Sequence, residues 1–243
     1  MNDLFCWELK FKSCTYSESL LNKICIQNKI SNHKVDILQI KKAIYYAKKY
    51  HGSQKRLSGE PYYSHPLTVA ELVAPYCFKT DILVTSILHD VIEDTELTKD
   101  MLEYIFDANI ASKVDDLTRV KIDRKISSAE MVQLLYISKK YNLLLIKMFD
   151  RVHNMQTIEA KPKEKLIKST EETIEFFIII LMQLRHTLPS AIELENKLMT
   201  LCLQNIPTSL PKLSQKTFSF EDDFQLPFPI FQNNISLNNL LYE

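Results

Sequence analysis

Glycine is scarce in this sequence of 243 residues, in which only Gly52 and Gly59 occur. An average composition of roughly 7% would give about seventeen glycines. Hairpin turns, dinucleotide-binding fingerprints and P-loops all need glycine, either for a positive φ angle or for close approach of the backbone to phosphate. The shortage therefore excludes these motifs and favours an all-α fold.

An excess of charge of one sign is also lacking, because 30 lysine and arginine residues balance 30 aspartate and glutamate residues. A balanced chain has no overall field that would attract nucleic acid or an anionic membrane surface. We therefore expect neither as a partner, and any polyanion must bind at a local site. The composition leaves the oligomeric state open.

The sequence lacks the cysteine pattern of a disulfide framework or a zinc site. Its five cysteines are an odd number without C-x-x-C spacing, namely Cys6, Cys14, Cys25, Cys77 and Cys202. No secretory signal segment is evident near the start. Reduced thiols fit a cytoplasmic protein, which is the location we expect.

No apolar run is long enough to span a membrane. The strongest run, residues 174–184, is about half of the ~20 residues that a membrane span requires. Glu175 lies inside it. We predict a buried helix at this position.

Proline divides the chain into unequal parts. Four of the nine prolines fall within residues 207–243, where they exclude a continuous helix. We expect a C-terminal appendage there, with enough aromatic residues to pack on the domain or on a partner. The main domain is expected over residues 34–206, after an N-terminal extension over residues 1–33.

Apolar residues recur at helical spacing through the main domain. Asp36 and Thr98 can each cap a helix, and Pro66 suits a first helical turn, which places His65 at the N-cap. One apolar stripe predicts a helix from about residue 81 to 92. Further helices are expected near residues 108–118, 128–140, 143–159, 163–184 and 190–204. These stripes are typical of core packing rather than of a cofactor site.

Two histidines and two aspartates stand in three polar segments: His65, the adjacent pair His89 and Asp90, and Asp150. A single histidine beside an apolar stripe is more often a hydrogen-bonded core residue than a ligand, and an Asp-Arg pair is usually an exposed charge pair. Together, however, two neutral imidazoles and two carboxylates suit a divalent transition metal. Their conjunction therefore predicts a metal site.

A polar face on one expected helix supports this prediction. Asp150, Asn154 and Thr157 are spaced i, i+4, i+7, so their side chains line one face of the helix. Polar groups on an otherwise inward face need partners, and a metal with a polar ligand would supply them.

Three extended motifs carry a family resemblance: R-x-S-G-E-P-Y-x-x-H-P over residues 56–66, L-H-D-V-I-E-D-T over 88–95 and D-R-x-H-N-M-x-T over 150–157. In this order they resemble the hydrolase domain of the RelA/SpoT alarmone enzymes, in the HD phosphohydrolase superfamily. The resemblance is strongest over residues 36–185 and implies an HD-domain helical bundle. It also implies Mn²⁺-dependent hydrolysis of the 3′-pyrophosphate of guanosine tetra- and pentaphosphate, which degrades the alarmones of the stringent response.

The resemblance further implies a role for each matching residue. The implied metal ligands are His65, His89, Asp90 and Asp150. The implied catalytic acidic pair is Glu93 and Asp94. The implied substrate-binding residues are Arg56, Ser58, Asn154 and Thr157. Physical chemistry agrees with two of these roles. Glu93 lies one helical turn beyond His89, where a carboxylate could take a proton from water without being a ligand. Arg56 offers a flat cation that suits stacking on a purine.

Two other functions stay open. Another HD phosphohydrolase activity, on a different 3′-phosphorylated nucleotide or on NADPH, would keep the metal site and change the base pocket. Leu57 and Gln156, which replace basic residues common in the family, favour it. A non-catalytic nucleotide-binding regulatory module would fit the divergent stretch near residues 175–206, although the intact ligand set argues against it.

Two further expectations concern the chain as a whole and one unusual side chain. Nothing after residue 185 resembles the synthetase or regulatory domains of long family members, so we expect a stand-alone hydrolase.

Phe149 stands where a small residue usually precedes the aspartate, so its ring must find space outside the site.

Overall fold

The computed structural model describes residues 6–120 and 124–205. Within these ranges the regular structure is helical, and the strand-like pairing consists of two isolated bridges, Lys55 with Pro61 and Val120 with Lys125. The predicted all-α fold is therefore confirmed. The appendage expected over residues 207–243 lies outside the described residues, and the domain division near residue 33 stays a prediction.

The helices follow one another with short connections. In chain order they are α1 (Trp7–Lys10), α2 (Thr15–Ile30), α3 (Ile37–His51), α4 (Ser64–Val73), α5 (Thr80–Leu88), α6 (Val91–Asp94), α7 (Lys99–Ile105), α8 (Ala108–Leu117), α9 (Ser128–Ile137), α10 (Tyr141–Gln156), the 3₁₀ turn η1 (Ile158–Ala160), α11 (Lys163–Glu172), the π-helical segment η2 (Thr173–Ile178), α12 (Ile179–Leu184) and α13 (Ala191–Asn205).

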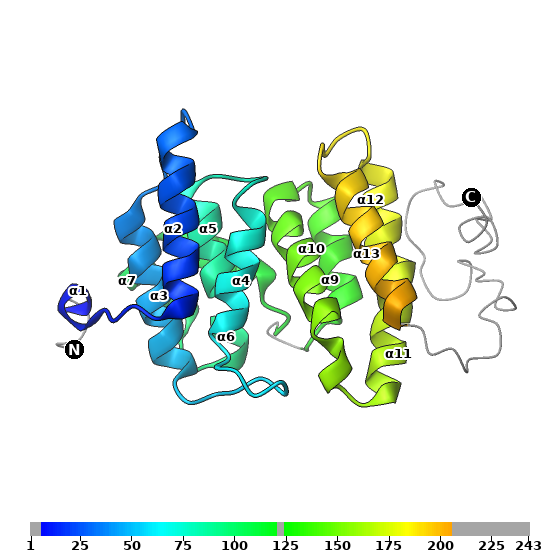
Figure 1. Cartoon of the computed structure of the whole chain (residues 1–243), viewed down its shortest axis with the longest axis horizontal. Helices are drawn as coiled ribbons and strands as arrows, with labels where there is room; N and C mark the ends of the chain where they lie inside the picture. The colour runs from blue at the N-terminus through cyan, green and yellow to red at the C-terminus, as the bar shows by residue number, and fades with distance from the viewer. Residues whose placement is uncertain (1–5, 121–123, 206–243) are drawn as a thin grey trace, which may run out of the picture. The chain divides into compact units, whose positions relative to one another are not determined.

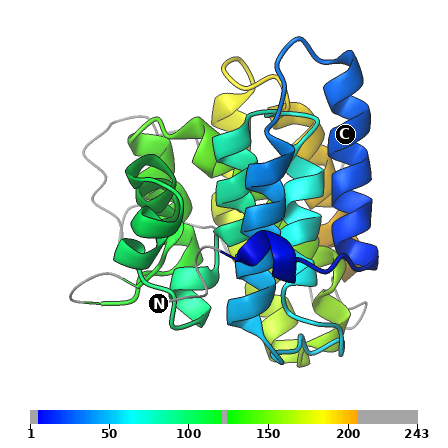
Figure 2. The same cartoon turned by 90° about the vertical axis from the view of Figure 1, so that its left-hand side faces the viewer.

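Helices α2 to α5 pack side by side in both views of the structure (Figures 1 and 2). The carboxylate of Asp36 accepts hydrogen bonds from the backbone N–H groups of Leu38 and Gln39, so it caps α3 as predicted. Helix α2 lies in the predicted N-terminal extension, yet its Leu20 and Ile24 are fully buried in the common core. This segment therefore contributes to the packing of α3 and α4.

Helix α10 joins the first helices to the last ones, because it packs on α4 and α5 as well as on α9 and α13 (Figure 1). Its apolar residues lie on nearly all sides and most are buried. A helix that is apolar around most of its circumference must lie in the interior. Any polar group on α10 is therefore placed in a largely dry environment.

The predicted helix from 81 to 92 is wrong in one respect, because the chain leaves the helix at His89 and Asp90. Helix α5 ends at Leu88 and the short α6 begins at Val91, with Asp90 at φ −105° and ψ −6°. The His89 ring nitrogen Nδ1 bonds the backbone carbonyl of Ser86 at 2.8 Å, which favours a helix end. The apolar stripe continues through the break, so periodicity did not reveal it.

The placement of His65 at an N-cap is also wrong, since α4 begins at Ser64 and its N-cap is Tyr63. The backbone N–H groups of Ser64 and His65 donate hydrogen bonds to the carbonyls of Pro61 and Tyr62. The chain therefore already turns before Ser64, and the helix begins one residue before His65. Pro66 remains in the first turn, as predicted.

The C-terminal helices agree with the expected ranges in outline. The region 163–184 is helical throughout, with the π-helical segment η2 in its middle. Phe177, Ile178 and Leu181 are buried there, as predicted for the apolar run. None of the described helices combines the length and the apolar character needed to cross a membrane.

Candidate metal centre

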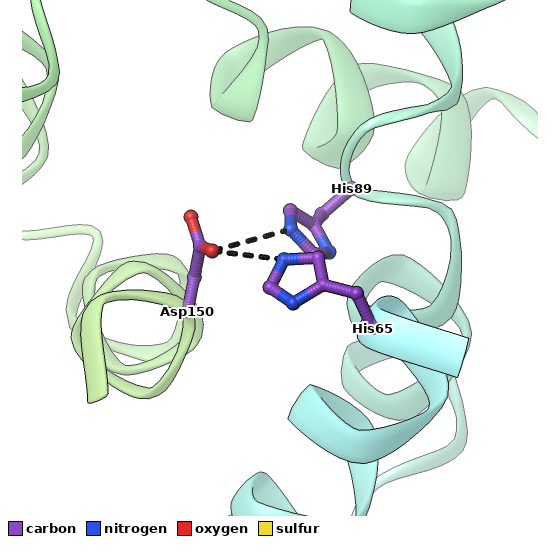
Figure 3. Close-up of side chains that lie close together, drawn as sticks. All are labelled: His65, His89 and Asp150. Atoms are coloured by element: carbon purple, nitrogen blue, oxygen red, sulfur yellow. Dashed lines mark ion pairs between the residues drawn. The ribbon is translucent and has the colours of Figure 1, made fainter. Parts of the chain in front are cut away.

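Three separate elements bring the predicted ligands to one place. His65 comes from the first turn of α4, His89 and Asp90 from the junction of α5 and α6, and Asp150 from the middle of α10. Figure 3 shows the imidazoles of His65 and His89 both facing the Asp150 carboxylate. One ligand atom from each of these three residues lies within 4.8 Å of the other two.

The contacts within the cluster are short. His65 Nε2 lies 3.0 Å from Asp150 Oδ1, and His89 Nε2 lies 3.1 Å from Asp90 Oδ1. The two cross distances are longer, at 3.7 Å from His65 Nε2 to Asp90 Oδ2 and 3.9 Å from His89 Nε2 to Asp150 Oδ1. The structure therefore brings all four predicted ligands together.

The tautomer of His89 is fixed by its backbone contact. A carbonyl oxygen only accepts hydrogen bonds, so Nδ1 donates its proton to Ser86 and Nε2 of the neutral ring carries a lone pair. This Nε2 is completely buried and has no hydrogen bond, because Asp90 Oδ1 lies close without the alignment of one. A buried lone pair thus faces a carboxylate oxygen.

Such an arrangement requires a positive charge between the two acceptors, and this observation tests whether the residues fit a metal ion. Burial opposes a charge on His89, but Asp90 and Asp150 outweigh burial and raise the His89 pKa, so a proton is attracted to this spot. A divalent cation would meet the same demand with imidazole nitrogens and carboxylate oxygens, which are common donors for manganese, iron and zinc. The donor set fits a metal ion.

A buried lysine that the sequence reasoning missed holds the carboxylates. Lys147 lies one turn before Asp150 on α10, with its Nζ 3.4 Å from Asp150 Oδ2 and 3.9 Å from Asp90 Oδ1. Burial disfavours both carboxylates in their charged form. The positive charge of His89, when protonated, and of Lys147 outweighs burial for Asp90. For Asp150 the positive charge of Lys147 and of His65, when protonated, does the same, so both pKa values are lowered. The i, i+3 spacing to Asp150 was a signal that could have identified Lys147.

The predicted acidic pair is divided between two environments. Glu93 bonds the guanidinium of Arg119 and also lies 2.9 Å from Lys125 Nζ. Burial opposes ionisation of Glu93, but these two cations outweigh it and lower its pKa. Both partners lie near the loop between α8 and α9, away in sequence from the motifs, so no local signal revealed them.

Asp94 lies beside the ligand cluster. The Tyr62 hydroxyl donates to Asp94 Oδ2 at 2.6 Å and also lies 3.3 Å from Asp90 Oδ2. Burial, together with the charges of Asp90 and Glu93, raises the pKa of Asp94 despite the hydrogen bond from Tyr62. A carboxylate with a raised pKa is a better proton acceptor than an ordinary one. Tyr62 was part of a quoted motif, but its role was not foreseen.

Three of the predicted substrate-binding residues, Arg56, Asn154 and Thr157, contact one another next to Asp150. Arg56 Nη2 donates to Thr157 Oγ1 at 2.9 Å and to Asn154 Oδ1 at 3.3 Å. Asn154 Nδ2 in turn donates to Asp150 Oδ1 at 2.6 Å, which links these residues to the ligand cluster. Ser58 lies exposed in the turn that follows Arg56.

A third histidine, His153, completes this group, and the sequence reasoning missed it. Its Nδ1 lies 2.7 Å from His65 Nδ1 and 3.3 Å from Arg56 Nη1. Burial, followed by repulsion from His65 and Arg56, lowers the pKa of His153 to about 3. His153 is therefore neutral at physiological pH.

The ring of Phe149 finds its space outside the cluster, as the sequence required. It is buried against Tyr76, with ring centroids 5.0 Å apart. The side chain of Leu57 is 72% exposed and lies open to solvent.

Comparisons with known proteins place the chain in a family. The sequence profile of a family described as "HD domain" matches residues 43–179. A GTP pyrophosphokinase of Brucella ovis is 36% identical over 157 residues, which cover 61% of this chain and 21% of that protein. A guanosine-3′,5′-bis(diphosphate) 3′-pyrophosphohydrolase of Aquifex aeolicus is 32% identical over 155 residues, which cover 63% of this chain and 22% of that protein. The chain therefore spans about a fifth of the length of these relatives.

A solved structure shares the fold. It belongs to a metazoan ortholog of SpoT, described as hydrolysing ppGpp, and superposes with a TM-score of 0.55 at 21% identity. The match covers 68% of this chain and 94% of the other.

Proposed function

The chain belongs to the HD domain family, and we propose that it hydrolyses the 3′-pyrophosphate of guanosine tetra- and pentaphosphate with the help of Mn²⁺. The products would be GDP or GTP and pyrophosphate. The observation that carries this proposal is the buried lone pair of His89, which faces carboxylates inside a cluster of two imidazoles and two aspartates. The relatives named for the synthesis and hydrolysis of such nucleotides support the choice of substrate.

We propose His65, His89, Asp90 and Asp150 as the metal ligands. A divalent ion held there would supply Lewis-acid chemistry, which would offset phosphate charge and make bound water more acidic. Lys147 and Asn154 hold the Asp150 carboxylate from two sides, so its oxygens are oriented before the substrate arrives. Mn²⁺ is favoured over softer ions because half of the donors are carboxylate oxygens.

Asp94 is the stronger of the two candidates for the proton acceptor. In the reaction a water oxygen forms a bond to the phosphorus attached to ribose O3′, the P–O3′ bond breaks, and O3′ gains a proton. Asp94 can take the proton that water loses, since it lies next to Asp90 and has a raised pKa. Glu93 would then hold α6, which carries both Glu93 and Asp94, to Arg119.

Arg56, Asn154 and Thr157 would hold the nucleoside. The edge of the Arg56 guanidinium is held by His153, Asn154 and Thr157, and we propose that the purine stacks on the flat face of this nearly buried side chain. Ser58 is exposed beside it and could contact the same ligand.

The test is direct. Metal-depleted protein is incubated with guanosine tetraphosphate, with and without added Mn²⁺, and the products are separated by ion-exchange chromatography. We expect GDP and pyrophosphate in equal amounts and only with the metal. Release of orthophosphate, or no turnover at any divalent ion, contradicts the proposal.

One observation favours a different substrate on the same site. The exposed Leu57 supplies no cation where family members commonly have lysine, so the attraction for a guanosine polyphosphate is reduced. The same assay with NADPH and with adenosine 3′-phosphorylated nucleotides decides this point. If these are hydrolysed as fast as guanosine tetraphosphate, the broader phosphohydrolase activity replaces the alarmone assignment.

A further inference from the structure

His153 and His65 meet edge to edge. Their Nδ1 atoms are 2.7 Å apart, the ring centroids 4.9 Å apart and the ring planes only 23° from parallel. Near-parallel rings that touch through two nitrogens lie almost in one plane, which is the geometry of an N–H···N hydrogen bond rather than of a face-to-face stack. One of the two nitrogens must therefore carry the proton.

Arg56 decides which one. Its Nη1 lies 3.3 Å from the same Nδ1 of His153, and a guanidinium has only donors. His153 Nδ1 is therefore the acceptor for Arg56, which means that it holds a lone pair. The proton between the two rings then belongs to Nδ1 of His65.

The consequence reaches the metal ligands. A neutral imidazole with its proton on Nδ1 presents a lone pair at Nε2. In His65 this is the atom that lies 3.0 Å from Asp150 Oδ1 and 3.7 Å from Asp90 Oδ2. His65 thus offers the ligand cluster the same kind of nitrogen that Ser86 imposes on His89.

We infer that His153 is a positioning residue, which with Arg56 fixes the tautomer and ring orientation of His65 for metal binding. This rests on the metal site of the proposed function but not on the identity of the nucleotide. All three side chains are buried or nearly so, which keeps water from replacing the bonds between them. Because Arg56 is also the proposed support for the purine, the metal ligand and the base pocket share one hydrogen-bonded chain.

The first experiment observes the proton itself. Protein with ¹⁵N-labelled histidine is examined by long-range ¹H–¹⁵N spectra at pH 8, without metal and with diamagnetic Zn²⁺. We expect a proton on His65 Nδ1 and none on His153 Nδ1 in both samples. A protonated His153 Nδ1, or a proton on His65 Nε2, overturns the inference.

The second experiment measures Mn²⁺ affinity by electron paramagnetic resonance. Loss of a partner that orients a metal-binding histidine typically costs 10- to 100-fold in affinity, so His153→Leu should weaken Mn²⁺ binding by about 10-fold or more. His153→Gln keeps an acceptor in reach of His65 and should restore most of that loss, which a merely structural role would not predict. His186→Leu, at an exposed histidine, is the matched control.

Every outcome of this titration is informative. Equal affinity of the parent protein and a folded His153→Leu variant overturns the inference. If His153→Leu does not fold, two single variants decide the question. Arg56→Met, which removes the donor to His153, should weaken Mn²⁺ binding, whereas His153→Gln should keep most of the affinity. Parent affinity in Arg56→Met then overturns the inference. If the parent protein itself binds no Mn²⁺, the proposed function fails, while the spectra of the metal-free protein still decide the tautomer.

Discussion

Glu93 and Arg119 form a two-point ion pair, in which Arg119 Nη2 lies 2.5 Å from Glu93 Oε1 and Nε lies 3.1 Å from Oε2. The backbone N–H of Arg119 also donates to Oε2, at 3.3 Å. Both oxygens of Glu93 are therefore engaged, whereas Asp94 has a hydroxyl on one of its oxygens. Two adjacent acidic residues with the same predicted role thus differ in their freedom to accept a proton.

The two residues should respond differently to removal of their charge. Asp94→Asn should lose on the order of 10²-fold or more in kcat while the variant still binds Mn²⁺, because a general base contributes this much. Glu93→Gln should lose less turnover and more stability, about 1–3 kcal/mol, since it leaves Arg119 and Lys125 without their charged partner. Steady-state kinetics and urea unfolding measure the two effects, with Glu96→Gln as a control at an exposed neighbouring position. Normal turnover in Asp94→Asn would remove Asp94 from the mechanism.

The Glu93 pair also predicts a pH dependence of stability. Its pKa in the folded state is lowered below the ordinary value of 4.5, so the unfolded state binds the proton more readily. The contribution of Glu93 to the free energy of unfolding is then fully present above about pH 5 and is lost as the pH falls through the folded pKa.

Urea unfolding of the parent and of Glu93→Gln between pH 3 and 7 measures this contribution. The difference in the free energy of unfolding should be constant near neutrality and shrink below about pH 4.5. Glu164→Gln, at an exposed position on α11, serves as the control and should show no such trend. A difference that stays constant down to pH 3 would show that the pair does not stabilise the fold through charge.

The contrast between these carboxylates also marks the limit of what the sequence could predict. Capping by Asp36 and Thr98 depends on residues within three positions of the helix start, so it could be read directly. The convergence of the four proposed ligands could be expected from their conjunction in three motifs. The partner of Glu93 lies 26 positions away, and the His65 contact with His153 spans 88 positions. Local periodicity does not predict such pairings, because they depend on how distant segments pack: α4 against α10 for His65 and His153, and α6 against the segment after α8 for Glu93 and Arg119.

Metal binding should stabilise the fold, since the ligands come from three separate elements. Mn²⁺ at about 100 times its Kd should add about 2.7 kcal/mol to the free energy of unfolding and raise Tm. Asp90→Ala should abolish this shift together with turnover, whereas Asp100→Ala, at an exposed aspartate on α7, should keep both. Differential scanning fluorimetry with and without Mn²⁺ provides the measurement. An undiminished shift in Asp90→Ala would exclude Asp90 as a ligand.

Arg56 provides the last prediction, because its guanidinium is held at its edge by three different acceptors. Nη2 reaches Thr157 and Asn154, and Nη1 reaches His153. A lysine ammonium is a point charge and cannot contact all three while presenting a flat face to a purine. Arg56→Ala should therefore raise KM by more than it lowers kcat, by about 1–3 kcal/mol in binding, and Arg56→Lys should recover little of this. Steady-state kinetics at saturating Mn²⁺ measure the two constants separately, so any weaker metal binding does not enter the comparison. Lys55→Ala, at the exposed neighbouring position, is the control for charge alone. If Arg56→Lys matches the parent protein in KM, a positive charge suffices at this position and stacking on the base is excluded.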